Sequence, residues 1–192
     1  MYAHGETKDK IANAIIYFAQ HATSQGKPLG LTKLMKLLFY LDFEFYQKTG
    51  FSSTGLDYFA WEQGPVPKLV WSNLKENDTS LELKDKVQLL QLKEDEVGTG
   101  IKVKKSFDSS IFTKLELKIL EQLSFTYQEC TATDISKISH ERNKPWDITK
   151  KTHGLKAKIN YNLAFPEDIS PEDLEEIQER QEDFEFFQKA FG

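Results

Sequence analysis

The sequence LTKLMKLLFYLDFEFYQKTG, residues 31–50, predicts the helix around which the rest of the chain folds. Its leucines and Phe45 recur at three- and four-residue spacing, the repeat that places side chains on one face of an α-helix. Other apolar residues widen this stripe over most of the helix circumference, and such a helix is buried. Thr32 is the candidate N-cap and Gly50 the expected end. We therefore expect residues 31–48 to form the central helix of the domain.

Helical spacing recurs on both sides of this helix, whereas one region between the helices changes its period. Residues 86–93 and 101–107 flank a segment with two glycines, and the second alternates apolar residues with lysine, as in a β-hairpin. Residues 141–150, which contain a Pro-Trp step, are expected to form a loop. The other expected helices are residues 7–22, 67–75, 113–126, 131–140 and 170–190. The predicted fold is mainly α (α+β): a compact helical domain with one small β-hairpin or short antiparallel sheet, plus a C-terminal acidic helix.

The last of these helices has a strong start signal. Ser170 is the expected N-cap, Pro171 occupies the first helical position, and Asp173 completes a capping box. Residues 167–185 contain ten acidic residues and one arginine. The preceding 166 residues carry about +3, because 23 of the 25 lysines and arginines but only 20 of the 30 acidic residues lie there. The charge pattern therefore separates a domain of residues 1–166 from an acidic helix of residues 167–192.

This acidic helix also contains apolar residues whose purpose the sequence leaves open. A charge run is usually a solvated face, and clustered aromatic side chains usually dock on the parent core. Alternatively, an acidic and aromatic helix contacts a basic surface on a partner. The residues that would form such a partner-binding tail are Phe184, Phe186, Phe187 and Phe191.

Composition indicates a globular protein of the cytoplasm. The 192 residues are 39% hydrophobic and 29% charged, which suits one domain with its own core. A single cysteine excludes an internal disulfide. The N-terminal segment lacks the apolar run of a signal peptide, and no apolar stretch is free enough of charge to enter a membrane. Only two of the 25 basic residues are arginine, which disfavours a nucleic-acid partner.

Residues that could carry chemistry are few. Cys130, Asp134 and His140 lie close in sequence, but proximity along the chain shows neither a base in reach of the thiol nor a lowered thiol pKa. The four histidines have no metal-ligand spacing, and no glycine-rich phosphate loop precedes a helix. We therefore expect no catalytic residue, no metal and no cofactor.

Two aromatic elements are more informative. In LDYFAWEQGPVPKLVWSNL, residues 56–74, two tryptophans flank a Gly-Pro-Val-Pro turn that Gly64 makes possible and the prolines stiffen. In the second element, His140 ends a helix and Trp146 is expected to fold back over it. Both elements are first expected to be structural. The alternative is that they share one surface used for a partner.

Three motifs, in this order along the chain, resemble the Panacea domain family of SocA-like antitoxins, which also occur as phage-associated proteins. They are the K-L-x-K-L-L-x-Y helix of residues 33–40, the W-x-x-G-P-V turn of residues 61–66 and the S-H-x…P-W element of residues 139–146. The resemblance covers residues 10–150 and gives no role to the hairpin or the acidic tail. The motif residues expected to be structural or partner-binding are Lys33, Tyr40, Trp61, Gly64, Pro65, Val66, His140, Pro145 and Trp146.

The resemblance implies a small, mostly helical, non-enzymatic protein that neutralises a cognate toxin by direct binding. Family members partner with very diverse toxins. In the SocA system the antitoxin delivers its toxin to the ClpXP protease, so a proteolytic adaptor with a ClpXP-type partner is the first alternative. An enzyme of unknown type is the second.

Overall fold

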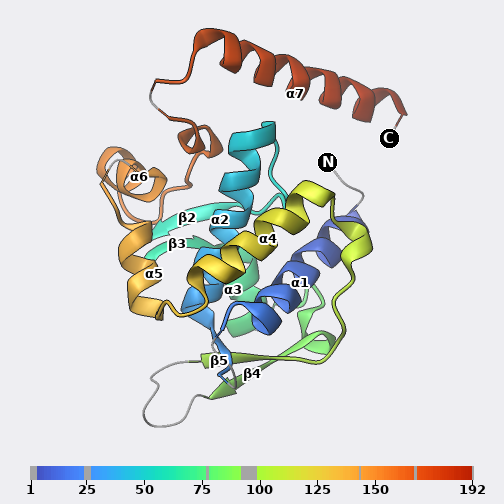
Figure 1. The fold of residues 1–192 in the computed structure, drawn as a ribbon, viewed down its shortest axis with the longest axis vertical. Coiled ribbons are helices and arrows are strands. Elements are labelled where there is room, and N and C mark those ends of the chain that lie inside the picture. The colour runs from blue at the N-terminus through green and yellow to red at the C-terminus, as the bar shows by residue number, and fades with distance from the viewer. Residues whose placement is uncertain are drawn as a thin grey trace.

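The computed structural model describes residues 4–23, 27–76, 78–91, 99–142, 144–166 and 168–191. At residues 4–6, 184, 185 and 187–191 it describes the backbone alone. Figure 1 shows a mainly helical molecule with small antiparallel sheets, which confirms the predicted fold class. The α-helices are α1 (His4–His21), α2 (Leu31–Thr49), α3 (Lys68–Lys75), α4 (Lys114–Tyr127), α5 (Ala132–Ser139), α6 (Pro145–His153) and α7 (Pro171–Phe191). The strands are β1 (Leu29–Gly30), β2 (Tyr58–Trp61), β3 (Gly64–Pro67), β4 (Val87–Gln91) and β5 (Thr99–Val103).

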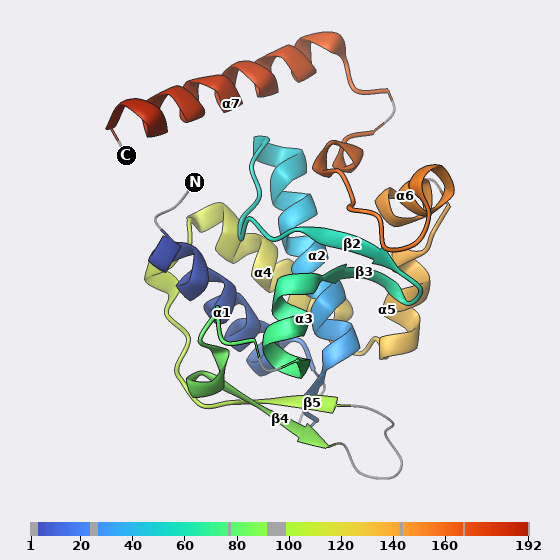
Figure 2. The ribbon, with the colours of Figure 1, turned by 180° about the vertical axis from the view of Figure 1, so that it is seen from behind.

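Helix α2 is the central helix, as predicted. Figures 1 and 2 show it between a layer formed by α1 and α4 and a layer formed by β2, β3 and α3. The predicted N-cap is wrong: Gly30 caps the helix without a side-chain bond, because β1 runs straight into it. The predicted end is confirmed, since Gly50 adopts φ 77° and its N–H donates to the Tyr46 carbonyl.

The predicted hairpin forms, and a third strand joins it. Strands β4 and β5 pair antiparallel with Val87 opposite Val103, and β1 adds to the other edge of β5. The connection at residues 92–98 lies outside the described residues. The strand that leads into α2 is therefore held by a distant hairpin.

A second hairpin was not predicted. Strands β2 and β3 pair antiparallel from Tyr58 opposite Pro67 to Trp61 opposite Gly64. Proline cannot donate to a ladder, so two prolines in four residues indicate a turn rather than a strand. They are tolerated here because β3 is the edge strand of this hairpin. The further ladder bonds are made by its partner β2, where the Ala60 N–H donates to the Ala157 carbonyl at 2.9 Å.

The predicted loop at residues 141–150 is also wrong, because residues from Pro145 onward form α6. Pro145 occupies the first turn of the helix, where a missing N–H costs no intrahelical bond. Proline here starts an element instead of interrupting one.

Helix α7 begins as predicted, with the Asp173 N–H donating to Ser170 Oγ at 3.0 Å. It lies across the C-terminal end of α2 (Figure 1). Within its described residues, only Leu174, Ile177 and Gln181 are half-buried. The Gln181 amide donates to the Tyr46 hydroxyl at 3.1 Å and to the Gly50 carbonyl. The division at residue 166 stays a prediction.

The tail phenylalanines are placed only in part. Phe186 is 67% exposed, whereas the side chains of Phe184, Phe187 and Phe191 lie outside the described residues. In the described part of the chain, no helix has both the length and the apolar character that a bilayer crossing requires.

A buried ion pair joins α1 to α4. Lys10 Nζ lies 2.6 Å from Glu116 Oε1, and the two side chains are 3% and 0% exposed. Glu116 also accepts hydrogen bonds from the Ser53 hydroxyl and, in a capping box, from the Thr113 N–H. Removing one charge leaves the other buried without its counterpart.

We predict that Lys10→Met lowers the free energy of unfolding by about 3–5 kcal/mol, because the Glu116 carboxylate stays buried without its cation. The double variant Lys10→Met/Glu116→Gln is expected to recover part of this loss, since glutamine keeps the capping box. Urea unfolding followed by circular dichroism measures both. An equal loss in the single and double variants would contradict the charge argument.

A second buried carboxylate predicts a pH dependence. Asp42 of α2 is inaccessible to solvent and accepts hydrogen bonds from the Thr54 N–H and from the Tyr58 hydroxyl, each at 2.6 Å. Burial raises the pKa of Asp42 from 3.8 to about 6, although the hydrogen bonds oppose that shift.

A carboxyl that binds its proton more tightly in the folded state makes folding less favourable as the pH rises. We expect the contribution of Asp42 to the free energy of unfolding to fall by about 2 kcal/mol between pH 4 and pH 6. The test is chemical unfolding across this range, in which Asp42→Asn should show a flatter profile than the parent. Parallel profiles would overturn the assignment.

Candidate functional site

The three sequence motifs meet at one corner of the fold, where β3 approaches α2 and the end of α5. Gly64 has φ 104° and faces both helices. A Cβ placed on Gly64 would lie 2.7 Å from Lys36 Cε, 2.7 Å from Ser139 Oγ and 3.1 Å from His140 Nε2. Both the backbone conformation and the space therefore require glycine.

Trp146 closes this corner from the side of α6, as the sequence predicts. Its ring stacks on His140 with centroids 3.8 Å apart and planes 14° apart. Its Nε1 donates to the Trp61 carbonyl at 2.8 Å, which ties α6 to β2. Lys150 Nζ lies 4.8 Å from the Trp146 ring centroid, within cation–π range. One indole thus joins the second and third motifs.

The electrostatics of the corner follow from burial. Lys36 is 1% exposed, and burial lowers its pKa to about 8. Burial, followed by the charges of Lys36 and Lys150, also lowers the pKa of His140, while a hydrogen bond to the Gln63 backbone acts in the opposite direction. His140 therefore binds a proton less readily than a solvent-exposed histidine.

His140 Nε2 is buried and makes no hydrogen bond to any residue that the structure describes. It faces Gly64 and Lys36 rather than solvent. This corner, called the packed joint below, brings together α2, β3 and the end of α5. The side chains of Lys36, Ser139 and His140 pack around Gly64 there.

The other motif residues lie around this joint. Pro65 and Val66 are buried in β3, and Trp61 packs edge-on against Trp71 with centroids 5.4 Å apart. Lys33 lies outside the corner and donates to the Gln128 carbonyl at 3.0 Å. Tyr40 and Pro145 instead line a neighbouring groove.

The structure does not join Cys130, Asp134 and His140 into a catalytic arrangement. The Asp134 carboxylate accepts hydrogen bonds from the Thr131 N–H and hydroxyl and so caps α5. Cys130 is half-buried. Among the described residues, no three His, Cys, Asp or Glu side chains gather closely enough to hold a metal ion.

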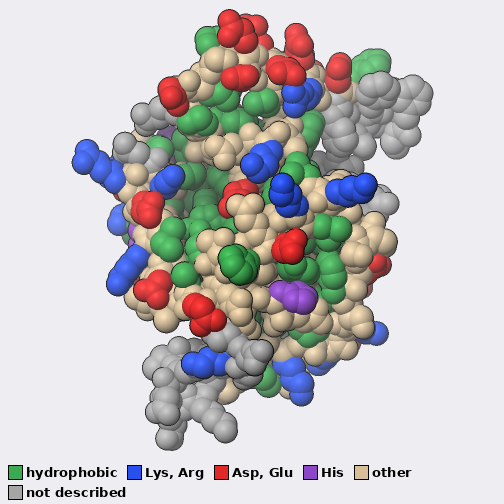
Figure 3. Space-filling model, viewed as in Figure 1, with side chains coloured by type: hydrophobic (Ala, Val, Ile, Leu, Met, Phe, Trp, Pro, Cys, Tyr) green, Lys and Arg blue, Asp and Glu red, His purple; other side chains and the backbone are tan. Residues whose placement is uncertain are grey.

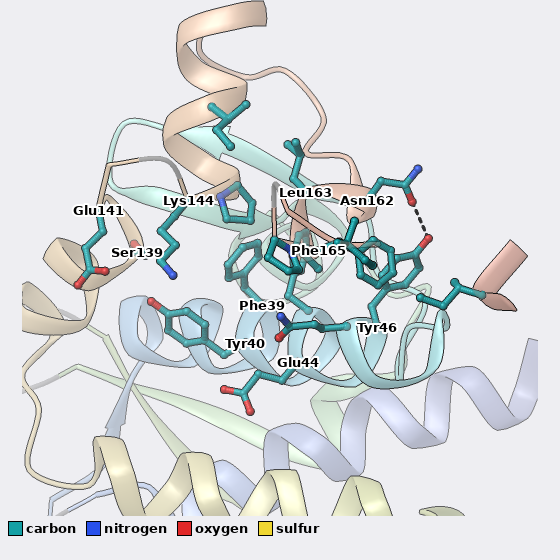
Figure 4. Close-up of a pocket in the computed structure, with 18 of the residues that line it drawn as sticks. Phe39, Tyr40, Glu44, Tyr46, Ser139, Glu141, Lys144, Asn162, Leu163 and Phe165 are labelled. Atoms are coloured by element: carbon teal, nitrogen blue, oxygen red, sulfur yellow. Dashed lines mark hydrogen bonds between the residues drawn. The ribbon is translucent and has the colours of Figure 1, made fainter. Parts of the chain in front are cut away.

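The groove beside the corner has a volume of about 790 Å³ and was not predicted. It lies between α2, the α5–α6 region, the 3-10 turn η3 (Tyr161–Ala164) and α7 (Figure 4). Figure 3 shows it as a hollow with hydrophobic side chains below the acidic surface of α7. Its apolar lining residues include Phe39, Tyr40, Phe43, Tyr127, Ile148, Leu163, Phe165, Leu174 and Ile177.

One sequence signal could have indicated this groove. Tyr40, Glu44 and Gln47 follow one another at four- and three-residue spacing and line the groove from α2. This narrow polar stripe is the part of an otherwise apolar helix that the core does not cover. The remaining walls come from segments far away in sequence.

We predict that Gly64→Ala destabilises the protein, because the new Cβ overlaps Lys36 and Ser139 in addition to straining the backbone. Gly154→Ala is the matched control: Gly154 has φ 86°, but no atom lies within 4 Å of its Cβ position. The free energy of unfolding should fall by about 1–3 kcal/mol more for Gly64→Ala. Equal losses would mean that the corner has room for a side chain.

The joint and about half of the residues that line the groove lie within a segment shared with a known family. The family model described as antitoxin SocA-like, Panacea domain, matches residues 34–147, more than half of the chain. The match runs from α2 into α6 and leaves α1 and α7 outside. Comparisons with curated proteins and with solved structures find no match. The chain belongs to the family of SocA-like antitoxins with a Panacea domain.

Proposed function

We propose that this protein is a cytoplasmic antitoxin that neutralises a cognate protein toxin by binding it directly. The observation that carries the proposal is where the family match falls. It covers the segment that builds the packed joint and the floor of the apolar groove, and leaves out α1 and α7. A rigid support beside an open apolar hollow suits protein recognition, in which a preformed surface binds without paying for its own ordering.

The exposed face of α7 supports a second contact with the toxin. Of its described side chains, only a narrow stripe is half-buried, and Phe186 is 67% exposed. The acidic residues of its described part are exposed as well. We propose that the stripe holds α7 on the domain while its far end meets the toxin. Phe184, Phe187 and Phe191 belong to the same proposal.

The corner has a supporting part in this proposal. Trp61, Gly64, His140 and Trp146 lock α2, β3 and α6 together. They hold the groove walls in place, and the toxin need not touch them. If the corner is only structural, substitutions there change toxin binding only by lowering the stability of the protein.

The test is co-expression with the toxin-like product of a neighbouring gene, scored by growth rescue and by pull-down. We predict that removing residues 184–192 weakens neutralisation at least about tenfold, because it deletes the phenylalanine cluster. The shortened protein keeps Leu174, Ile177 and Gln181, so its thermal unfolding should match the parent. Removing residues 167–192 is the companion variant, and it tests whether the preceding domain folds alone.

Three outcomes would overturn parts of this proposal. Unchanged neutralisation by the folded, shortened protein would remove the tail from the toxin interface. A fall in toxin level that depends on a ClpXP-type protease would show an adaptor rather than a simple inhibitor. Loss of activity in Cys130→Ala or His140→Ala proteins that still fold and bind the toxin would indicate an enzyme.

A further inference from the structure

One end of the groove combines aromatic rings with negative charge. Tyr40 of α2 and Tyr127 of α4 stack with ring centroids 5.2 Å apart and planes 4° apart. Glu44 of α2 and Glu141, just after α5, line the same end of the groove. Burial raises the pKa of both phenols, and the charges of both glutamates raise them further. The two carboxylates therefore lie near the same tyrosine pair.

One buried polar atom and one half-buried carboxylate lie at this end. The Tyr40 hydroxyl is buried and makes no hydrogen bond to the residues that the structure describes. In Figure 4 it points toward Glu141, Ser139 and Lys144. Glu44 is half-buried, and burial raises its pKa although the charge of Lys48 opposes this. Burial of a carboxylate is unfavourable, so a further cation that arrived here would be stabilised.

The surroundings favour a positive occupant over a negative one. Of the described lining residues, Glu44 and Glu141 carry negative charge and Lys144 carries positive charge. Another wall of the groove is α7, whose described part presents seven acidic side chains and Arg180 to solvent. Figure 3 shows these acidic residues above the hydrophobic hollow. An apolar hollow with a negative rim is complementary to an apolar segment with a basic residue.

We propose that the groove receives an apolar segment of the partner toxin that carries an arginine or lysine, with the cation between Glu44 and Glu141 against the Tyr40–Tyr127 pair. The inference rests on the proposed function and adds the chemistry of the partner. Carboxylates supply charge-assisted hydrogen bonds to the cation, and the phenol rings supply a cation–π face. The space of about 790 Å³ admits several neighbouring side chains of one segment.

The test uses a defined probe, a fluorescein-labelled amphipathic helical peptide of leucine and arginine, with a matched peptide in which glutamine replaces arginine. Fluorescence anisotropy measures the affinity of the full chain for each. The groove variant is Glu44→Gln/Glu141→Gln. The matched control is Glu82→Gln/Glu121→Gln, which removes the same charge from exposed positions outside the groove.

We expect the groove variant to bind the arginine peptide at least about tenfold more weakly than the parent, and the control variant to stay within about twofold. The glutamine peptide should bind weakly to all three proteins. Equal losses in both variants, or equal affinity for both peptides, would reduce the effect to general attraction by α7 and overturn the inference.

Pull-down of the toxin separates this inference from the proposed function. If the groove variant retains full toxin binding, direct neutralisation stands and the groove assignment falls. If the parent binds the arginine peptide selectively but no toxin, the proposed function falls and the cation selectivity stands. Sedimentation velocity tests whether a second copy of this chain fills the groove instead. A dimer formed by the parent but not by the groove variant would show this and overturn the inference.

Discussion

Helix α2 is buried on nearly every side, so each polar side chain on its inner faces must find a partner inside the protein. Asp42 is met by Thr54 and Tyr58, and Lys33 by the Gln128 carbonyl. These contacts reach the loop before β2, β2 itself and the end of α4. The polar groups of one helix thus fix where its neighbours can pack, because a mismatch would leave a buried charge or hydroxyl without a partner.

Lys36 is the exception, since burial lowers its pKa and no hydrogen bond or ion pair joins it to another described residue. It lies instead against Gly64 and close to His140, whose pKa is lowered in part by the charge of Lys36. The closed corner and the open groove meet at this point, because Ser139 faces Gly64 on one side and lines the groove on the other. A tightly packed joint therefore supports a surface that remains available to a partner.

The sequence was sufficient where local rules decide the structure. Periodicity and Gly50 predicted the course and the end of α2, and Ser170 with Asp173 predicted the start of α7. Local rules failed at prolines, because Pro65 lies in an edge strand and Pro145 starts a helix. The stacking of Trp146 on His140 followed from their closeness in sequence. The meeting of Lys36 with Gly64 and that of Tyr40 with Tyr127 depend on how distant elements pack, which no local pattern encodes.

Gly50 joins two features that a reader of the sequence would treat separately. It ends α2 in a left-handed conformation, and a Cβ there would lie 2.7 Å from Ile177 Cγ2 of α7. Any other residue would strain the helix end and at the same time push α7 off its narrow contact. A substitution at Gly50 would therefore disturb the end of α2 and the position of α7 together. The end of the central helix and the position of the C-terminal helix are coupled through one residue.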